Sequence, residues 1–169
     1  HTFVKAIEDS CLSKGGDKVI SVTANTTDGH SRSLLMASNG FDGYAEATYY
    51  VGSATMTAKD EGHRRPMDYG VAVALHRKDL EKAEEIGNDA AERTLALLGQ
   101  KKLKTETLPI IVENRIVGRI MSGLLGPMSG RAIQQKQSFL ADKKGRKIGS
   151  AVLTLIDDPL LKRGLGSNT

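Results

Sequence analysis

The sequence has no tryptophan, few other aromatic residues and a single cysteine. Three Phe and four Tyr make up 4% of its 169 residues, so the core must be built from Val, Ile, Leu, Ala and Met. Because Cys11 is alone, no disulfide can form within the chain, as is usual in a reducing compartment. No apolar run approaches the roughly 18 residues of a membrane span, and no signal peptide is visible. We therefore expect a cytoplasmic protein with no membrane partner.

Motifs that would carry chemistry are also missing. Gly164 and Gly166 are too sparse for a phosphate loop and lie in a terminal loop, not between a strand and a helix. Cys11 has no nearby histidine and lies on an apolar stripe, which favours a buried structural thiol. The adjacent carboxylates Asp157 and Asp158 are more typical of a turn than of an acid–base pair. No catalytic site can be assembled from these residues.

The charged residues do not define a binding surface either. His63 lies close in sequence to Asp60, Glu61 and Asp68, which could suggest a metal site, but acidic loops of this kind are usually only hydrated. The net charge is +4, and the basic residues form small groups in predicted loops and turns. A nucleic-acid surface would need these charges on one face with aromatic side chains between them. The sequence therefore does not favour a nucleic-acid partner.

Residues 17–76 have the alternation of an antiparallel sheet. Strands are predicted at 17–25, 33–38, 44–58 and 67–76. Asp28-Gly29 predicts a turn over Thr27–His30, and Asn39-Gly40 predicts a tight hairpin, because both dipeptides suit positive φ. One face of this meander should be exposed to solvent, and another element should pack against the other face.

Two amphipathic helices flank the predicted sheet. Residues 1–13 place Phe3, Val4, Ile7, Cys11 and Leu12 on one stripe, and Gly15-Gly16 should end the helix. Asp79–Leu98 repeats apolar residues at three- to four-residue spacing and ends before Gly99. We expect this second helix to cover the sheet. Replacing Ile86 or Leu95 by Ala should then cost about 2–5 kcal/mol.

A polar, basic linker, Gln100–Thr107, separates this part from the rest of the chain. After it, the pattern predicts a buried strand at Pro109–Val112 and a helix over Asn114–Leu125, with Asn114 as its cap. The stripe of Ile116, Ile120 and Leu124 should be core. Gly126-Pro127 should end or bend the helix, and a second helix from about 128 to 137 and a strand at 148–155 should follow. The fold class is α+β: an antiparallel sheet covered by an amphipathic helix, then the start of a second α+β domain.

Four stretches in register resemble one known family. They are ASNGF (37–41), the strand and helix of residues 68–99, SGRAIQQKQSFLADKKGRKI (129–148) and LTLIDDPLLKRGLGS (153–167). Their order and spacing resemble the TldD/PmbA family, often called modulators of DNA gyrase, over nearly the whole chain. By this resemblance the chain looks like a central fragment. Residues 1–100 would be the C-terminal part of an N-terminal α+β domain, and residues 101–169 the beginning of the C-terminal domain.

The resemblance implies a cytoplasmic, two-subunit zinc metallopeptidase that takes short or unfolded peptides into an enclosed chamber. In its catalytic subunit, a strand like Pro109–Val112 leads to a helix with the motif HExxxH, whose histidines bind zinc while the glutamate serves the attacking water. A gapless alignment from Ser129-Gly130 places these positions at Met121, Ser122 and Gly126.

None of these three residues can replace the motif. A thioether is a poor zinc ligand, a serine is no general base, and glycine has no side chain. No histidine occurs anywhere from 77 to 169. The resemblance therefore implies a PmbA/TldE-like, non-catalytic subunit that lacks a metal. Zinc would be bound only by a TldD-like partner in a heterodimer that acts on peptides.

Two alternatives stay open. A peptidase acting alone would need a site outside these residues. A regulator of DNA gyrase, or another nucleic-acid-associated protein, would agree with the common name of the family that the chain resembles.

Overall fold

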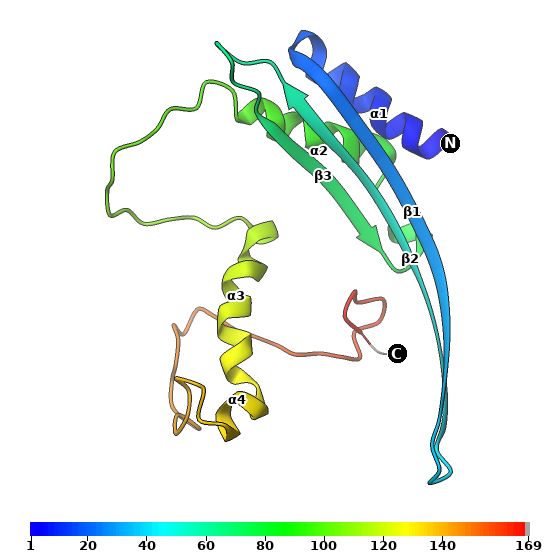
Figure 1. Ribbon diagram of the computed structural model, residues 1–169, viewed down its shortest axis with the longest axis vertical. Helices are drawn as coiled ribbons and strands as arrows, with labels where there is room; N and C mark the ends of the chain where they lie inside the picture. Colours follow the sequence, from blue (N-terminus) through cyan, green and yellow to red (C-terminus); the bar gives the residue numbers. More distant parts are fainter. Residues whose placement is uncertain (168–169) are drawn as a thin grey trace. The chain divides into compact units, whose positions relative to one another are not determined.

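The computed structural model describes residues 1–167, which divide into two compact units. The first unit comprises residues 1–102 together with the residues from Asp158 onward, and the second comprises Leu103–Asp157. Helices and a three-stranded antiparallel sheet are both present, so the α+β class predicted from the sequence is confirmed (Figure 1). Within the described residues, no helix is long and apolar enough to cross a membrane.

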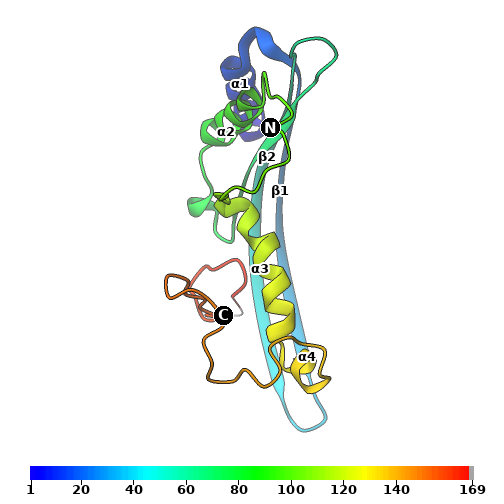
Figure 2. The same ribbon diagram turned by 90° about the vertical axis from the view of Figure 1, so that its left-hand side faces the viewer.

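The first unit contains every strand of residues 1–167 and two long α-helices. In chain order its elements are α1 (Thr2–Gly15), η1 (Gly16–Lys18), β1 (Val19–Met36), β2 (Asp42–Ala58), β3 (Met67–Ala74), η2 (Arg77–Asp79) and α2 (Ala83–Ala96). The strands lie in the order β1-β2-β3, so the chain forms a simple meander. Both α1 and α2 lie on the same face of the sheet, and no α-helix described in this unit covers the other face (Figures 1 and 2).

The predicted hairpin at Asn39-Gly40 is confirmed. Gly40 has a φ of 88°, and its N–H donates to the carbonyl of Ala37 at 3.0 Å. The N–H of Phe41 donates to the side-chain oxygen of Asn39 at 3.1 Å. Glycine is suited to this position because a side chain strains the backbone at positive φ. The turn joins β1 directly to β2.

The turn predicted at Thr27–His30 is wrong. Asp28, Gly29 and His30 lie inside β1 and pair with Tyr50, Tyr49 and Thr48 of β2. The Tyr49 ring lies across Gly29 so closely that a Cβ there would clash with it. Gly29 is thus needed for a close approach within a strand, and the two strands predicted on either side of it are one strand of 18 residues.

The core of the first unit lies between the helices and the sheet. Its fully buried side chains come from both helices and from alternate positions of β2: Ile7, Cys11, Ala54, Met56, Ala58, Ile86, Ala90 and Ala91. Ala72 and Ala74 of β3, each 5% exposed, complete the sheet side of this layer. Three glycines let the layers approach closely. A Cβ on Gly70 would lie 2.5 Å from the Ile86 carbonyl, one on Gly52 would lie 2.9 Å from the Ile86 Cδ1, and one on Gly87 would clash with α1. The cover predicted for Asp79–Leu98 is therefore present, although the α-helix starts at Ala83.

Asp60 connects the loop after β2 to the end of α2. Its carboxylate accepts from the N–H of Glu61 at 2.8 Å and from the N–H of Gly99 at 3.2 Å, and Arg64 lies 3.4 Å away. The hydrogen bond from Glu61 is the main reason why the pKa of Asp60 lies below its ordinary value. This loop acid therefore has a structural role.

The second unit contains α3 (Asn114–Met128) and α4 (Gly130–Gln134). The strands predicted at 109–112 and 148–155 are absent from its described residues, and Ile110 and Ile111 are 78% and 102% exposed. A strand needs a neighbour for its backbone hydrogen bonds, and neither segment has one within this unit. The side chains of Ile116, Ile120 and Leu124 are 46%, 51% and 38% exposed, so the prediction of this stripe as core is wrong.

The ends of these helices also differ from the predictions. Glu113, not Asn114, occupies the cap position of α3, and no side chain caps it there. Pro127 lies inside the last turn of α3, so the helix continues three residues past Leu125. Ser129 then caps α4 by accepting from the N–H of Ala132 at 3.3 Å, and α4 has only five residues.

Candidate functional site

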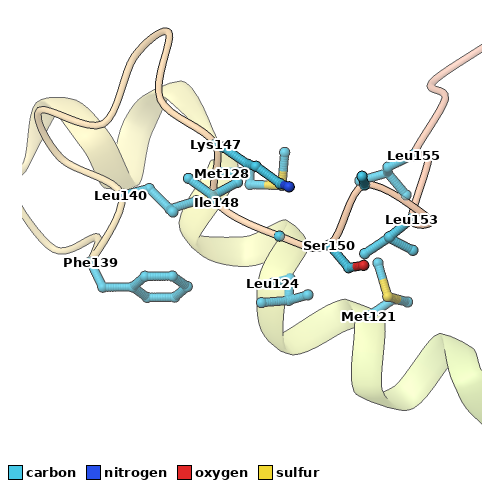
Figure 3. Close-up of a pocket in the computed structure, with 12 residues that line it drawn as sticks. Met121, Leu124, Met128, Phe139, Leu140, Lys147, Ile148, Ser150, Leu153 and Leu155 are labelled. Carbon is cyan, nitrogen blue, oxygen red and sulfur yellow. The ribbon is translucent and has the colours of Figure 1, made fainter.

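A hollow of the second unit lies beside the C-terminal half of α3. It has a volume of about 320 Å³, and its lining is mainly apolar. Its lining residues are Met121, Leu124, Met128, Phe139, Leu140, Lys147, Ile148, Gly149, Ser150, Ala151, Leu153 and Leu155. Figure 3 shows that these side chains come from three segments: α3, the loop after α4, and residues 147–155. The hollow therefore depends on how the two loops fold back against α3.

Ser138 fastens one of these loops to the helix. Its hydroxyl donates to the carbonyl of Pro127 at 2.6 Å and accepts from the N–H of Leu140 at 3.0 Å. Ser138 is 8% exposed, which is unusually low for this unit. The bond to Pro127 places Phe139 and Leu140 at the hollow. Sequence reasoning missed Ser138, because a serine before an apolar pair has no distinctive local pattern.

The chemistry of the lining is limited. Lys147 offers the one charge, and the Ser150 hydroxyl accepts from the N–H of Val152 at 3.4 Å. A serine nucleophile needs an adjacent base, and the lining contains no histidine or carboxylate. The hollow can accept an apolar side chain but has no groups for acid–base or nucleophilic catalysis.

The three residues that the resemblance places at the zinc motif have different surroundings in the structure. Met121 lines the hollow and points toward Leu153 (Figure 3). Ser122 is exposed, and its hydroxyl donates to the Arg119 carbonyl at 2.8 Å. Gly126 is exposed at the end of α3, where a Cβ would meet nothing within 4 Å. These three residues supply no ligand that zinc prefers.

Elsewhere in the chain, acidic and histidine side chains do not gather either. Among residues 1–167, no group of three or more His, Cys, Asp and Glu side chains is placed to hold a metal ion. Asp60, which the sequence places near His63, is instead bonded to the end of α2. The Cys11 thiol is fully buried, and burial raises its pKa, so it is the structural thiol that the sequence predicts.

Comparison with known proteins defines the class to which this fold and site belong. Residues 2–98 match the central domain, and residues 105–169 the C-terminal domain, of the metallopeptidases described as PmbA/TldA. The two matches follow one another along the chain and together cover most of it. It belongs to the TldD/PmbA family.

Individual relatives agree with this assignment. The metalloprotease PmbA of Escherichia coli O157:H7 is 30% identical over 125 residues, which are 74% of this chain and 27% of that protein. The PmbA homologue of Buchnera aphidicola from Acyrthosiphon pisum is 35% identical over 123 residues, which are 72% of this chain and 27% of that protein. The chain therefore spans about a quarter of the length of these relatives.

A solved structure extends the likeness to nearly every residue. A protein of Bacteroides thetaiotaomicron, described as a candidate modulator of DNA gyrase, superimposes with a TM-score of 0.90 at 36% identity. The match covers 99% of this chain and 38% of that one. A Thermotoga maritima protein with the same description, at 23% identity and a TM-score of 0.87, has the same fold.

Proposed function

We propose that this chain is part of a non-catalytic, PmbA/TldE-like subunit of a two-subunit zinc metallopeptidase that processes short or unfolded peptides. The partner would be a TldD-like subunit that carries HExxxH and holds the zinc. Residues 1–100 and 101–169 would contribute the end of one domain and the beginning of the next, and the complex would act in the cytoplasm.

The observation that carries this proposal is the composition of α3. Family membership supports a metallopeptidase setting, and the aligned positions Met121, Ser122 and Gly126 offer zinc a thioether, a hydroxyl and no side chain. A catalytic zinc site needs three good protein ligands and one open position. The apolar hollow at Met121 then suits a wall of the chamber, where it would contact an apolar part of the peptide or of the partner.

Elemental analysis tests the metal part of this proposal. The purified chain should contain no stoichiometric zinc and should cleave no unfolded peptide, whereas the HExxxH-bearing partner prepared in the same way should contain zinc. One tightly held zinc per chain, removed by a chelator together with peptidase activity, would overturn both the alignment and the non-catalytic role.

A matched pair of variants on α3 tests the role of the hollow. Met121→Glu places a charge in the apolar lining, whereas Ser122→Glu adds the same charge at the neighbouring exposed position. In the complex with the partner, we expect the first variant to slow peptide cleavage and the second to leave it unchanged. Equal rates of peptide cleavage for both variants would mean that the hollow does not line the chamber.

The description of the Bacteroides relative favours a second candidate, a regulator of DNA gyrase that acts at nucleic acid. Contacts to phosphates weaken steeply as salt rises. Binding of the chain to duplex DNA that falls by orders of magnitude between low and moderate salt would favour this candidate over the peptidase subunit.

A further inference from the structure

The hairpin of β1 and β2 extends past the rest of its unit. β3 pairs with β2 only over residues 50–57, and both helices cover the sheet at the same end (Figures 1 and 2). The remaining part, residues 29–36 of β1 with 42–49 of β2, is a two-stranded ribbon, called here the distal ribbon. Its side chains are largely exposed. A two-stranded hairpin is marginally stable in water by itself, so the distal ribbon would gain from a further strand.

The outer edge of β1 is open to such a strand. β1 occupies one side of the sheet and pairs only with β2 in the part of the chain that the structure describes. Exposed edges in natural proteins are commonly protected by lysine or proline, and neither occurs between Val19 and Met36. The edge is therefore long, and its sequence does not oppose pairing.

The charges on this strand are few and regularly placed. Asp28 and Arg32 are the only acidic and basic residues of β1 apart from His30, which lies midway between them. Residues two and four apart share one face of a strand, so all three side chains lie on the same face. Asp28 is exposed and forms no ion pair within residues 1–167, while Arg32 lies 3.6 Å from Glu46.

This arrangement is complementary to itself. If two copies of β1 pair antiparallel with His30 opposite His30, each Asp28 faces the Arg32 of the other copy. Any antiparallel register that sets Asp28 opposite Asp28, or Arg32 opposite Arg32, brings like charges together. Only the register centred on His30 matches both opposite charges at once, and it has the two-fold symmetry of a homodimer.

The His30 side chain does not obstruct this centre. Its Nε2 lies 2.5 Å from Glu46 Oε1, so the ring is held toward the neighbouring strand β2 of its own ribbon. Tyr44 donates to the other carboxylate oxygen at 2.8 Å, and this bond, followed by the one to His30, lowers the pKa of Glu46. Each imidazole therefore faces a carboxylate of its own copy.

We propose that a second copy of this chain pairs along the outer edge of β1, antiparallel and centred on His30, so that two three-stranded sheets join into one of six strands. The contact uses the first unit alone and does not rest on the proposed peptidase role. Two Asp28–Arg32 pairs fix its register.

Charge exchange tests the register. Sedimentation of the whole chain over a range of concentrations should show a dimer that weakens in high salt. Asp28→Arg and Arg32→Asp should each weaken the dimer about tenfold or more, because two attractive cross-strand pairs become repulsive. The double variant Asp28→Arg/Arg32→Asp should restore it, as should an equimolar mixture of the two single variants. A monomeric parent chain, or a dimer that the single variants leave unchanged, would overturn the proposal.

A cross-link tests the centre without relying on affinity. Directly opposite residues of paired strands have Cβ atoms about 4.5–5.5 Å apart, close enough for a disulfide after small adjustments. His30→Cys should therefore form a covalent dimer on mild oxidation, whereas Asn25→Cys, away from the two-fold axis, should not. Cys11 is buried and does not compete. Equal cross-linking of the two variants would place the interface elsewhere.

Discussion

The replacement of Ile86 by Ala tests whether α2 and the sheet share one core. Ile86 is 1% exposed, and its atoms lie against Gly52 of β2 and Gly70 of β3. The change removes three carbon atoms, worth about 0.8 kcal/mol each in transfer free energy, or about 2.4 kcal/mol together. A cavity term adds to this where the surroundings cannot collapse, and the close glycine contacts hinder collapse. We therefore expect a loss of about 3–4 kcal/mol in the free energy of unfolding, within the usual range for this change.

Tyrosine fluorescence is a suitable measurement, because all four tyrosines (Tyr44, Tyr49, Tyr50 and Tyr69) lie in the first unit and the chain has no tryptophan. For a unit of this size, a loss of about 3 kcal/mol should lower the melting midpoint by roughly 12 °C or more. Ile20→Ala removes the same atoms from a side chain that is 48% exposed, so it should cost about 1 kcal/mol. Equal shifts for the two variants would refute the argument that burial against α2 stabilises this unit. Leu95 is only half-buried, so its replacement should cost less than the range expected from the sequence.

Two further predictions concern the same unit. Gly70→Ala should destabilise it by about 1–3 kcal/mol in urea titrations, because the new Cβ would lie 2.5 Å from a carbonyl of α2. The control Gly118→Ala, on exposed α3, should not destabilise this unit. Unchanged stability of the Gly70 variant would mean that α2 can move away from the sheet without cost. Asp60 has a folded-state pKa below its ordinary 3.8, so the stability it contributes is present above that pH and is lost as the pH falls through the folded value. In the Asp60→Asn variant, the melting midpoint should therefore fall less steeply as the pH is lowered through this acid range. If it falls as steeply as in the parent chain, other carboxylates cause the loss of stability in acid.

Much of the first unit could be predicted from the sequence, because its signals are local and repeated. The apolar spacing of α2 and the Asn39-Gly40 turn each specify one structure. Asp28-Gly29 carries the same turn signal as Asn39-Gly40 but lies inside β1. What distinguishes the two is the Tyr49 ring across the sheet, and a contact of this kind is not visible in a window of neighbouring residues.

In the second unit, by contrast, the sequence predicts little of the structure. Pro109–Val112 has the composition of a buried strand, but composition cannot supply the neighbouring strand that its backbone needs. These residues accordingly form neither a strand nor a helix. The hollow was also beyond prediction, since its walls meet through Ser138 and Pro127, which lie 11 residues apart on either side of α4. Of the positions that the resemblance singled out, only Met121 lies in the hollow.

The distal ribbon also bears on how this unit can vary in evolution. Under the helices, the glycine contacts leave no room for larger side chains, so residues there can change little. Beyond them, two residues added to each strand would lengthen the hairpin by one pleat and keep every side chain on its own face. The reach of the ribbon can thus change in steps of about 7 Å without disturbing the core. Related proteins can therefore differ in the length of this ribbon while the part of the sheet beneath the helices stays the same.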